Sequence, residues 1–206
     1  MDWNRISSEL NRKLDPANVR PAKSFGPKGD YIEGWHAMAE ANRIFGFDGW
    51  SYTVPECTCV FHGARDIGKD KKPGFGVTYT AKVSVVVDGV IREDFGAGHG
   101  YDVDCGLAHE SAIKEAITDA LKRALRSFGN PFGLALYDKT RENVGFEAST
   151  SEVEAAKEAC RACRDLDALS AWWTGLYKNM RHVADHPDVI AAKDAQKLAV
   201  TMQGAA

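Results

Sequence analysis

The hydrophobic residues between His109 and Gly133 recur at intervals of three and four, which is the period of one helical face. The apolar positions are Ile113, Ala116, Ile117, Ala120, Leu121, Ala124, Leu125 and Phe128. A second face carries a stripe spaced by one helical turn, formed by Lys114, Thr118, Lys122 and Arg126, with Arg123 beside it. We expect Gly129 to end the helix in a left-handed conformation, and Pro131 prevents its continuation. The pattern predicts a helix with one buried face and one row of cations, which suits a polyanion.

Two shorter helices are predicted nearer the N-terminus. Residues 2–14 have one apolar side, formed by Trp3, Ile6, Leu10 and Leu14. Asp30 and Glu33 have the spacing of a capping box, so we expect a second helix from Asp30 to about Phe45 that stops at Gly46. The sequence therefore predicts two helices before its first strand.

Alternating polar and apolar residues predict three strands, over residues 50–61, 77–87 and 90–95. Asp88-Gly89 is a strong signal for a two-residue hairpin turn between the last two strands. We expect a polar loop over 62–75 and a glycine-rich turn, GAGHG, over 96–100. This order of elements predicts an α+β fold, in which an antiparallel β-sheet of three or more strands packs against helices.

The 206 residues, 44% of them hydrophobic, suit one core of good size and an appendage. We expect one domain over residues 1–145, a small and polar linker over 146–151, and a small helical C-terminal region over 152–206. That last region is predicted to form two or three short helices. Its adjacent Trp172 and Trp173 favour a packing or partner surface over base stacking.

The formal net charge is −3, so binding of a polyanion requires that the charges be segregated along the chain. Residues 63–82 contain five Lys or Arg against two Asp, and residues 109–141 contain six cations against four acidic residues. These excesses are modest. A binding patch must therefore arise from geometry, or from several subunits placed side by side.

The odd number of cysteines, five, and the absence of a signal peptide favour a reducing, cytoplasmic setting. No apolar run reaches membrane-spanning length, so no membrane partner is expected. Cys57 and Cys59 share one face of a strand, and Cys160 and Cys163 lie one helical turn apart. Neither pair has the setting of a structural zinc site, so we expect buried thiols and no bound metal.

Two further patterns bear on enzyme chemistry. Residues 63–70, GARDIGKD, nearly match a phosphate-binding P-loop, but an aspartate replaces the hydroxyl that would hold Mg²⁺, and no nucleotide cofactor is expected. Asp102 and Asp104 fit turn or capping roles, as do His99 and His109. The two aspartates leave a metal-dependent, DNA-processing nuclease as an alternative reading.

Three blocks of sequence carry a family resemblance, namely LNRKLDPANV (10–19), DYIEGWHAMAEANRIFGFDGW (30–50) and KEAITDALKRALRSFGN (114–130). The DG hairpin followed by REDFGAG lies between them in the right order. Residues 3 to about 145 thereby resemble the N-terminal annealing domain of the Rad52 family of homologous-recombination proteins, and the third block is very specific to it. The tail does not resemble those of eukaryotic members, so we expect a phage or bacterial single-strand annealing protein.

The resemblance implies an α+β unit that assembles into a closed, ring-shaped homo-oligomer. Single-stranded DNA would run in a positively charged groove with its bases presented for pairing, without ATP and without enzymatic catalysis. The same resemblance makes Lys122, Arg123 and Arg126 the inner-groove cations and places Lys139 near a secondary DNA site. Lys114 extends their stripe and completes the expected set on this helix.

Three further expected DNA-binding positions depart from the family pattern. His36 stands where the family has an arginine, and a largely neutral imidazole binds phosphate more weakly. Phe47 keeps the ring of a family tyrosine without its hydroxyl. Lys72 lies within a residue or two of another family lysine and is expected to substitute for it in part. A third function class stays open, an adaptor whose C-terminal helices recruit a replication or repair protein.

Overall fold

Residues 1–22 and 29–203 are described by the computed structural model, and the chain divides into two compact units. The N-terminal unit is Met1–Val144 and the C-terminal unit is Gly145–Ala206. Each unit has hydrophobic clusters of its own, and none of these clusters contains residues of both. Each unit therefore has a hydrophobic core of its own.

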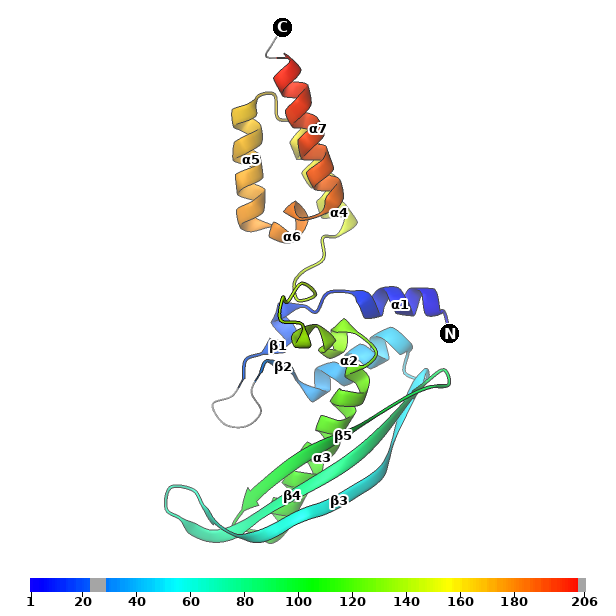
Figure 1. Ribbon diagram of the computed structural model, residues 1–206, viewed down its shortest axis with the longest axis vertical. Helices are drawn as coiled ribbons and strands as arrows, with labels where there is room; N and C mark the ends of the chain where they lie inside the picture. Colours follow the sequence, from blue (N-terminus) through cyan, green and yellow to red (C-terminus); the bar gives the residue numbers. More distant parts are fainter. Residues whose placement is uncertain (23–28, 204–206) are drawn as a thin grey trace. The chain divides into compact units, whose positions relative to one another are not determined.

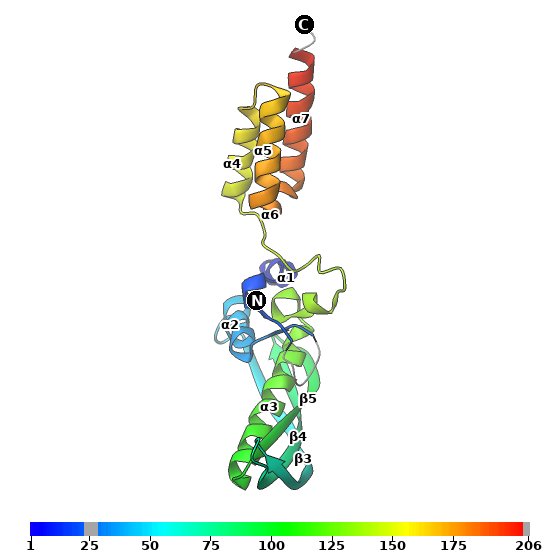
Figure 2. The same ribbon diagram turned by 90° about the vertical axis from the view of Figure 1, so that its left-hand side faces the viewer.

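A three-stranded antiparallel sheet with the order β3-β4-β5 forms the framework of the N-terminal unit (Figure 1). Its strands are β3 (Trp50–Ile67), β4 (Lys72–Val87) and β5 (Val90–Asp102). The long helix α3 (Cys105–Arg126) covers one face of this sheet, as Figures 1 and 2 show. The α+β class predicted from the sequence is confirmed.

The hairpin of β3 and β4 extends further into the polar segment than predicted. Pairing continues from His62 opposite Val77 to Ile67 opposite Lys72, so the loop expected over 62–75 is reduced to a turn over 68–71. β3 is exposed along most of its length and lacks the alternation that marks a half-buried strand. Its backbone pairing with β4 holds it in place whatever the polarity of its side chains.

The glycine-rich segment is not a turn, because β5 continues through it. Gly96, Gly98 and Gly100 are buried on the face that meets α3. A Cβ added to Gly98 would lie 2.1 Å from the carbonyl oxygen of Ala112, and one added to Gly100 would lie 1.7 Å from that of Ala108. The glycines are thus required because the helix backbone lies directly against the strand.

The helix α2 (Gly34–Phe45) begins later than predicted, and the capping box at Asp30 is wrong. Tyr31–Ile32 forms a short strand, β2, that pairs with β1 (Val19–Arg20). Glu33 is the N-cap residue but makes no side-chain capping hydrogen bond. The C-terminal end agrees with the prediction, since Gly46 follows Phe45 with a φ of 88°.

The ends of α3 have clear local causes. The Asp104 carboxylate accepts a hydrogen bond from the Leu107 amide at 3.0 Å and caps the N-terminus. At the other end, the left-handed conformation expected for Gly129 is wrong, because its φ of 168° is extended. Glycine is needed there for space, since a Cβ would lie 2.4 Å from the carbonyl oxygen of Leu10. The segment after α3 therefore packs closely against the last turn of α1 (Trp3–Asn11), to which Leu10 belongs.

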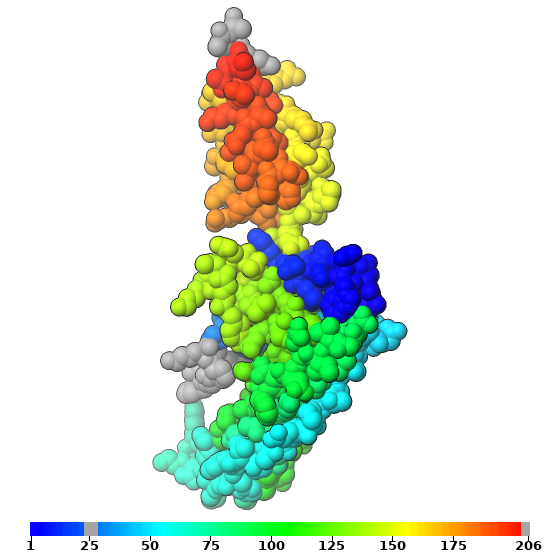
Figure 3. Space-filling view, turned by 45° about the vertical axis from the view of Figure 1, so that its right-hand side comes forward, coloured from blue at the N-terminus to red at the C-terminus, as the bar shows by residue number. Residues whose placement is uncertain are grey.

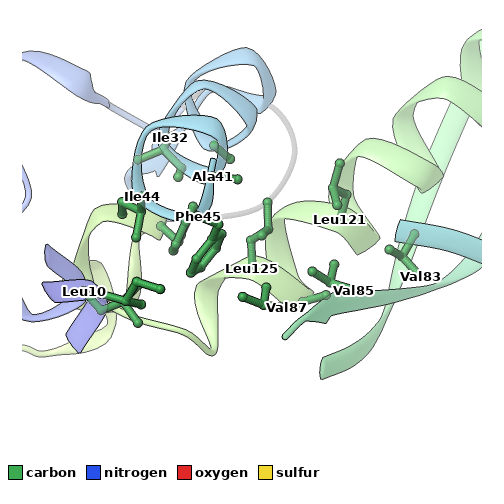
Figure 4. Packing of buried hydrophobic residues seen from close by; sticks show 14 of the residues in the cluster. Leu10, Ile32, Ala41, Ile44, Phe45, Val83, Val85, Val87, Leu121 and Leu125 are labelled. Atoms are coloured by element: carbon green, nitrogen blue, oxygen red, sulfur yellow. The ribbon is translucent and has the colours of Figure 1, made fainter. Parts of the chain in front are cut away.

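The main hydrophobic core lies where α1, α2, α3 and β4 meet (Figure 4). Figure 4 shows Phe45 of α2, Leu125 of α3 and Val87 of β4 at its centre. The Phe45 ring stacks on Phe132 at a centroid distance of 5.8 Å and meets the edge of Phe128 at 5.3 Å. This core fixes the C-terminal end of α3, which carries Lys122, Arg123 and Arg126.

The C-terminal unit contains four helices within residues 145–203, where the sequence predicted two or three. They are α4 (Thr150–Arg161), α5 (Leu166–Asn179), α6 (Arg181–Ala184) and α7 (Pro187–Gln203) (Figure 2). Trp172 and Trp173 are partly buried among them, in agreement with the packing role.

No helix in the described part of the chain is long and apolar enough to span a membrane.

Candidate nucleic-acid interface

The last two turns of α3 bring together three of the predicted cations, which we call the cation group: Lys122, Arg123 and Arg126. Leu121, Ala124 and Leu125 on the same turns are buried in the core and fix the backbone that carries them. The side chains of Arg123 and Arg126 remain 42% and 21% exposed. The group is therefore anchored on one side and accessible on the other.

Asp94 of β5 holds both arginines of the cation group. The Arg123 Nε donates to Asp94 Oδ1 at 3.1 Å, and the Arg126 Nη2 lies 3.6 Å from Asp94 Oδ2. No local sequence pattern points to Asp94, because 29 positions separate it from Arg123. One carboxylate thus orients two guanidinium groups side by side and leaves an excess of positive charge.

Aromatic rings lie beside the cation group. The guanidinium carbon of Arg126 is 4.3 Å from the centroid of the Tyr137 ring, and its Nη1 donates to the Tyr137 hydroxyl. The Lys122 ammonium is 5.7 Å from the centroid of the Tyr31 ring. Tyr137 is 68% exposed. Cations with adjacent rings suit a single-stranded nucleic acid, which offers both phosphates and base faces.

Lys114 belongs to the same helix but not to the cation group. It lies eight residues before Lys122, about 12 Å along the axis. Its ammonium pairs with Glu110, one turn earlier, and both side chains are well exposed. A surface pair of this kind is weak, so Lys114 remains available to an anion at small cost.

Lys72 lies at the far end of the sheet from the cation group. It starts β4, whereas Asp94 pairs with Val83 of that strand. Eleven residues of extended chain between Lys72 and Val83 correspond to roughly 35 Å. The structure does not bring Lys72 together with Lys122, Arg123 and Arg126 within one subunit.

His36 is buried, with 7% of its surface exposed, although the sequence suggested a groove ligand. It lines a hollow of 160 Å³ together with Arg12, Lys13, Arg43 and other residues. Burial lowers the pKa of His36, and Glu40 and Asp15 oppose this to a smaller extent. The imidazole is therefore a neutral, partly enclosed group at neutral pH.

Phe47 and Lys139 are both exposed. Phe47, two residues after the end of α2, is 87% exposed, which leaves its ring open to stacking. Lys139 follows the short helix η3 (Leu134–Tyr137). Within residues 1–22 and 29–203, neither side chain has a hydrogen bond, ion pair or ring contact with the cation group. The structure thus places both as separate surface positions.

The acidic turn before α3 has a structural role. Asp104 caps the helix, and Asp102 Oδ1 accepts a hydrogen bond from the Asp104 amide at 2.9 Å. The turn and capping roles predicted for these two residues are confirmed. Residues 63–67 of the P-loop-like segment lie in β3, and the chain continues into the turn and then into β4. That segment therefore lacks the helix that a P-loop requires.

The cysteines differ in part from the prediction. Cys160 and Cys163 are buried, but Cys57 and Cys59 on β3 are exposed, so the expectation of four buried thiols is half wrong. A further group, not predicted from the sequence, is formed by His62, Cys105 and His109, whose ligand atoms all lie within 4.8 Å of one another. Of the residues described, this is the group with a spacing suited to a metal ion.

The structure defines an α+β protein that carries three cations on the last two turns of α3. A family profile described as "Rad52/22 family double-strand break repair protein" matches residues 2–155, three quarters of the chain. The chain belongs to this family, as the three sequence blocks indicated. The match includes the whole N-terminal unit after its first residue.

Individual relatives agree with the family assignment. The chain is 44% identical over 138 residues to "DNA repair and recombination protein RAD52" of Kluyveromyces lactis, which covers 65% of this chain and 30% of that protein. It is 42% identical over 137 residues to the RAD52 protein of Saccharomyces cerevisiae, and the match covers 65% of this chain and 28% of that protein. It is 39% identical over 145 residues to rad22 of Schizosaccharomyces pombe, and the match covers 67% of this chain and 29% of that protein. These relatives are fungal and give no support to a phage or bacterial origin.

Proposed function

We propose that this protein binds single-stranded DNA and anneals complementary strands in double-strand break repair by homologous recombination, without ATP and without catalysing a covalent step. The cation group on α3 carries the proposal, because it combines three cations, an orienting carboxylate and two aromatic rings. The matched segment spans less than a third of the curated relatives' length, so this function is proposed for the part of the family that the chain represents.

Annealing requires a grip on the DNA that ignores sequence and leaves base edges free. Lys and Arg contacts to phosphates provide such a grip through counterion release. Complementary pairing then supplies the specificity that the protein surface lacks. The side chains of Lys122, Arg123 and Arg126 are chemically suited to this task.

We further propose that the protein acts as a ring-shaped homo-oligomer. The 18-residue strand β3 pairs with β4 along one edge, and no described strand pairs with its other edge. Figure 3 shows this strand, in cyan, at the surface of the N-terminal unit. An exposed edge of this length is a template for another chain, and a ring would join the modest cation groups of its subunits into a continuous track.

The sheet face opposite α3 supports the same proposal. The register places Phe61, Phe95 and Tyr101 on that face, and their exposed fractions are 56%, 50% and 47%. Exposed apolar side chains that share one face favour contact with another protein surface. A second copy of the chain would bury them.

Annealing of two complementary fluorescent oligonucleotides, without ATP or metal, tests the proposed activity. We expect the wild-type protein to accelerate annealing and the double variant Lys122→Ala/Arg123→Ala to lose most of the acceleration. The matched control is Lys178→Ala, which removes an exposed cation from α5 in the C-terminal unit. No acceleration by a folded wild-type protein would contradict the proposal and move the nuclease and adaptor readings ahead.

Salt dependence of binding gives a second readout on the same variants. For single strands, the slope of log K against log salt falls by roughly 0.7 for each phosphate contact. The double variant should therefore lose about 1.4 from the magnitude of the slope, whereas Lys178→Ala should keep the wild-type slope. Equal slopes for all three proteins would place the phosphate contacts elsewhere.

A ring is tested by native mass spectrometry of the intact chain. We expect a closed oligomer of defined subunit number. Phe61→Lys, which puts a charge on the open sheet face, should shift the population toward smaller species. A wild-type protein that stays monomeric at working concentrations would contradict the ring while leaving DNA binding by one subunit intact.

A further inference from the structure

We propose that His62, Cys105 and His109 form a binding site for a Zn²⁺ ion. The three ligand atoms lie within 4.8 Å of one another, and one residue is exposed while the other two are partly buried. Imidazole nitrogen and thiolate sulfur are the ligands that zinc prefers in proteins. The site is independent of the proposed DNA function, since His109 lies 13 residues before Lys122, about 20 Å along α3.

The two imidazoles already have the spacing of zinc ligands. His109 Nε2 and His62 Nδ1 are 3.3 Å apart. Two nitrogens bound to zinc at about 2.0–2.1 Å with tetrahedral angles are separated by about 3.3–3.4 Å. The sulfur of Cys105 lies within 4.8 Å of both other ligand atoms, which places it beside the two nitrogens.

The topology of the N-terminal unit brings the ligands together from distant positions. Cys105 begins α3, and His109 follows one turn later on the same helical face. His62 comes from β3, where it pairs with Val77, a buried residue on the sheet face that α3 covers. A bound ion would therefore link the edge strand β3 to the start of α3.

Tyr79 provides the outer contact that zinc-binding histidines usually have. Its hydroxyl lies 3.0 Å from His109 Nδ1, the nitrogen that faces away from His62. With zinc on Nε2, Nδ1 carries the proton and donates it to the Tyr79 oxygen, which fixes the tautomer and the ring orientation. Tyr79 is thus a positioning residue for the proposed ligand.

A hydrogen-bonded pair of histidines without metal is the competing explanation of the same geometry. In that case the Tyr79 hydroxyl donates to His109 Nδ1, and His109 Nε2 donates to His62 Nδ1. The thiol of Cys105 then has no part in the cluster. The two explanations differ in whether Cys105 is needed, and this difference decides the design of the experiment.

Three protein ligands leave a fourth position of a tetrahedral ion for a water molecule. His62 is exposed, so an ion can enter from solvent. The ion would stabilise the folded N-terminal unit by binding it in preference to the unfolded chain.

The experiment uses the full-length protein after treatment with a chelator, titrated with Zn²⁺ and, in parallel, with Co²⁺. Cobalt in a tetrahedral site with a thiolate gives intense visible bands and a sulfur-to-cobalt charge-transfer band. We expect saturable binding at one ion per chain, these bands, and a zinc-dependent rise in Tm. Mg²⁺ at the same concentration should have no effect, because it prefers oxygen ligands.

Variants assign the site. Cys105→Ser should abolish the charge-transfer band and the rise in Tm. The control is Cys57→Ser, which replaces an exposed cysteine of β3, the strand that carries His62, and should leave both unchanged. Tyr79→Phe should weaken zinc binding about 10- to 100-fold while keeping the band at saturation. Circular dichroism of each metal-free variant establishes that it is folded. A charge-transfer band that survives in folded Cys105→Ser, or the absence of saturable zinc binding by the wild type, would overturn the proposal.

Discussion

The Nε of Arg123 on α3 and the Oδ1 of Asp94 on β5 are 3.1 Å apart, so a predicted DNA-binding cation is held by a carboxylate of the neighbouring strand. The same carboxylate lies 3.6 Å from Arg126. Asp94 therefore has two opposed effects. It orients the guanidinium groups, and it reduces the positive potential that a phosphate would meet.

The first prediction concerns the balance of these effects. Asp94→Asn should tighten binding of single-stranded DNA about twofold to fivefold at low salt, because it removes a negative charge beside the cation group. The gain should fade as salt screens the charges. Fluorescence anisotropy measures both effects. Asp185→Asn, which breaks an arginine–aspartate pair in the C-terminal unit, is the control. Weaker binding by Asp94→Asn at low salt would mean that orientation of the arginines matters more than potential.

The second prediction concerns the contact between β5 and α3. Gly98→Ala places a Cβ against backbone atoms of α3, so it should destabilise the protein by about 1–3 kcal/mol or more. Chemical denaturation followed by circular dichroism measures the change in the free energy of unfolding. Ala97→Ser, on the exposed face of the same strand, should change it by no more than about 0.5 kcal/mol. Equal stability of the two variants would show that α3 can move away from the strand.

The third prediction follows from the lowered pKa of His36. The unfolded chain takes up a proton near the ordinary value of about 6.5, whereas the folded protein does so only at lower pH. Stability is therefore fully present above about pH 6.5 and declines as the pH falls toward the folded pKa. Urea denaturation between about pH 7.5 and about pH 5 should show less of this decline in His36→Gln than in the wild type. An identical pH dependence of the two proteins would remove His36 as its cause.

The pH dependence of DNA binding follows from the same group. If protonated His36 assists phosphate binding, the gain should occur below about pH 6.5, because burial keeps the imidazole neutral above it. Anisotropy titrations of wild type and His36→Gln over the same range measure this effect. Parallel curves would show that the buried imidazole does not contact the DNA.

The fourth prediction concerns the C-terminal unit. Its helices pack on residues of their own unit, with Val153, Val183 and Val189 in one cluster. Removal of residues 146–206 should therefore leave the annealing rate of the N-terminal unit within about twofold of the wild type, because the cation group lies wholly outside the removed part. A shortened chain that folds but fails to anneal would assign the C-terminal unit a direct part in the reaction.

The sequence predicted those features that depend on local pattern. The period of Leu121 and Leu125 identified α3, and Asp88-Gly89 located the turn between β4 and β5. Prediction from the sequence failed where tertiary contacts decide the conformation. The glycines from Gly96 to Gly100 suggested a turn, because nothing local shows that a helix lies against them. Gly129 was expected to be left-handed for the same reason, although its actual requirement is space beside Leu10.

The candidate sites show the same division. The stripe of Lys122 and Arg126 was visible in the sequence, whereas their partner Asp94 was not, because only the packing of β5 on α3 brings it near. The spacing of Cys105 and His109 was a usable signal for half of a metal site. Its other half, His62, lies 47 positions from His109 and is supplied by the sheet.

The close contact at the glycines also matches the residue spacing of β5 to that of α3. Gly100, Gly98 and Gly96 oppose successive turns of α3, so two residues of strand, about 6.8 Å, match four residues of helix, about 6.0 Å. Asp94 lies two residues before Gly96 on the strand, and Arg123 lies three residues after Ala120 on the helix, so the pair comes about one turn beyond the last glycine contact. The ion pair between Asp94 and Arg123 thus continues the series of contacts between β5 and α3 that the glycines begin. An insertion of one residue in either element would leave every side chain intact and still separate this carboxylate from its arginine.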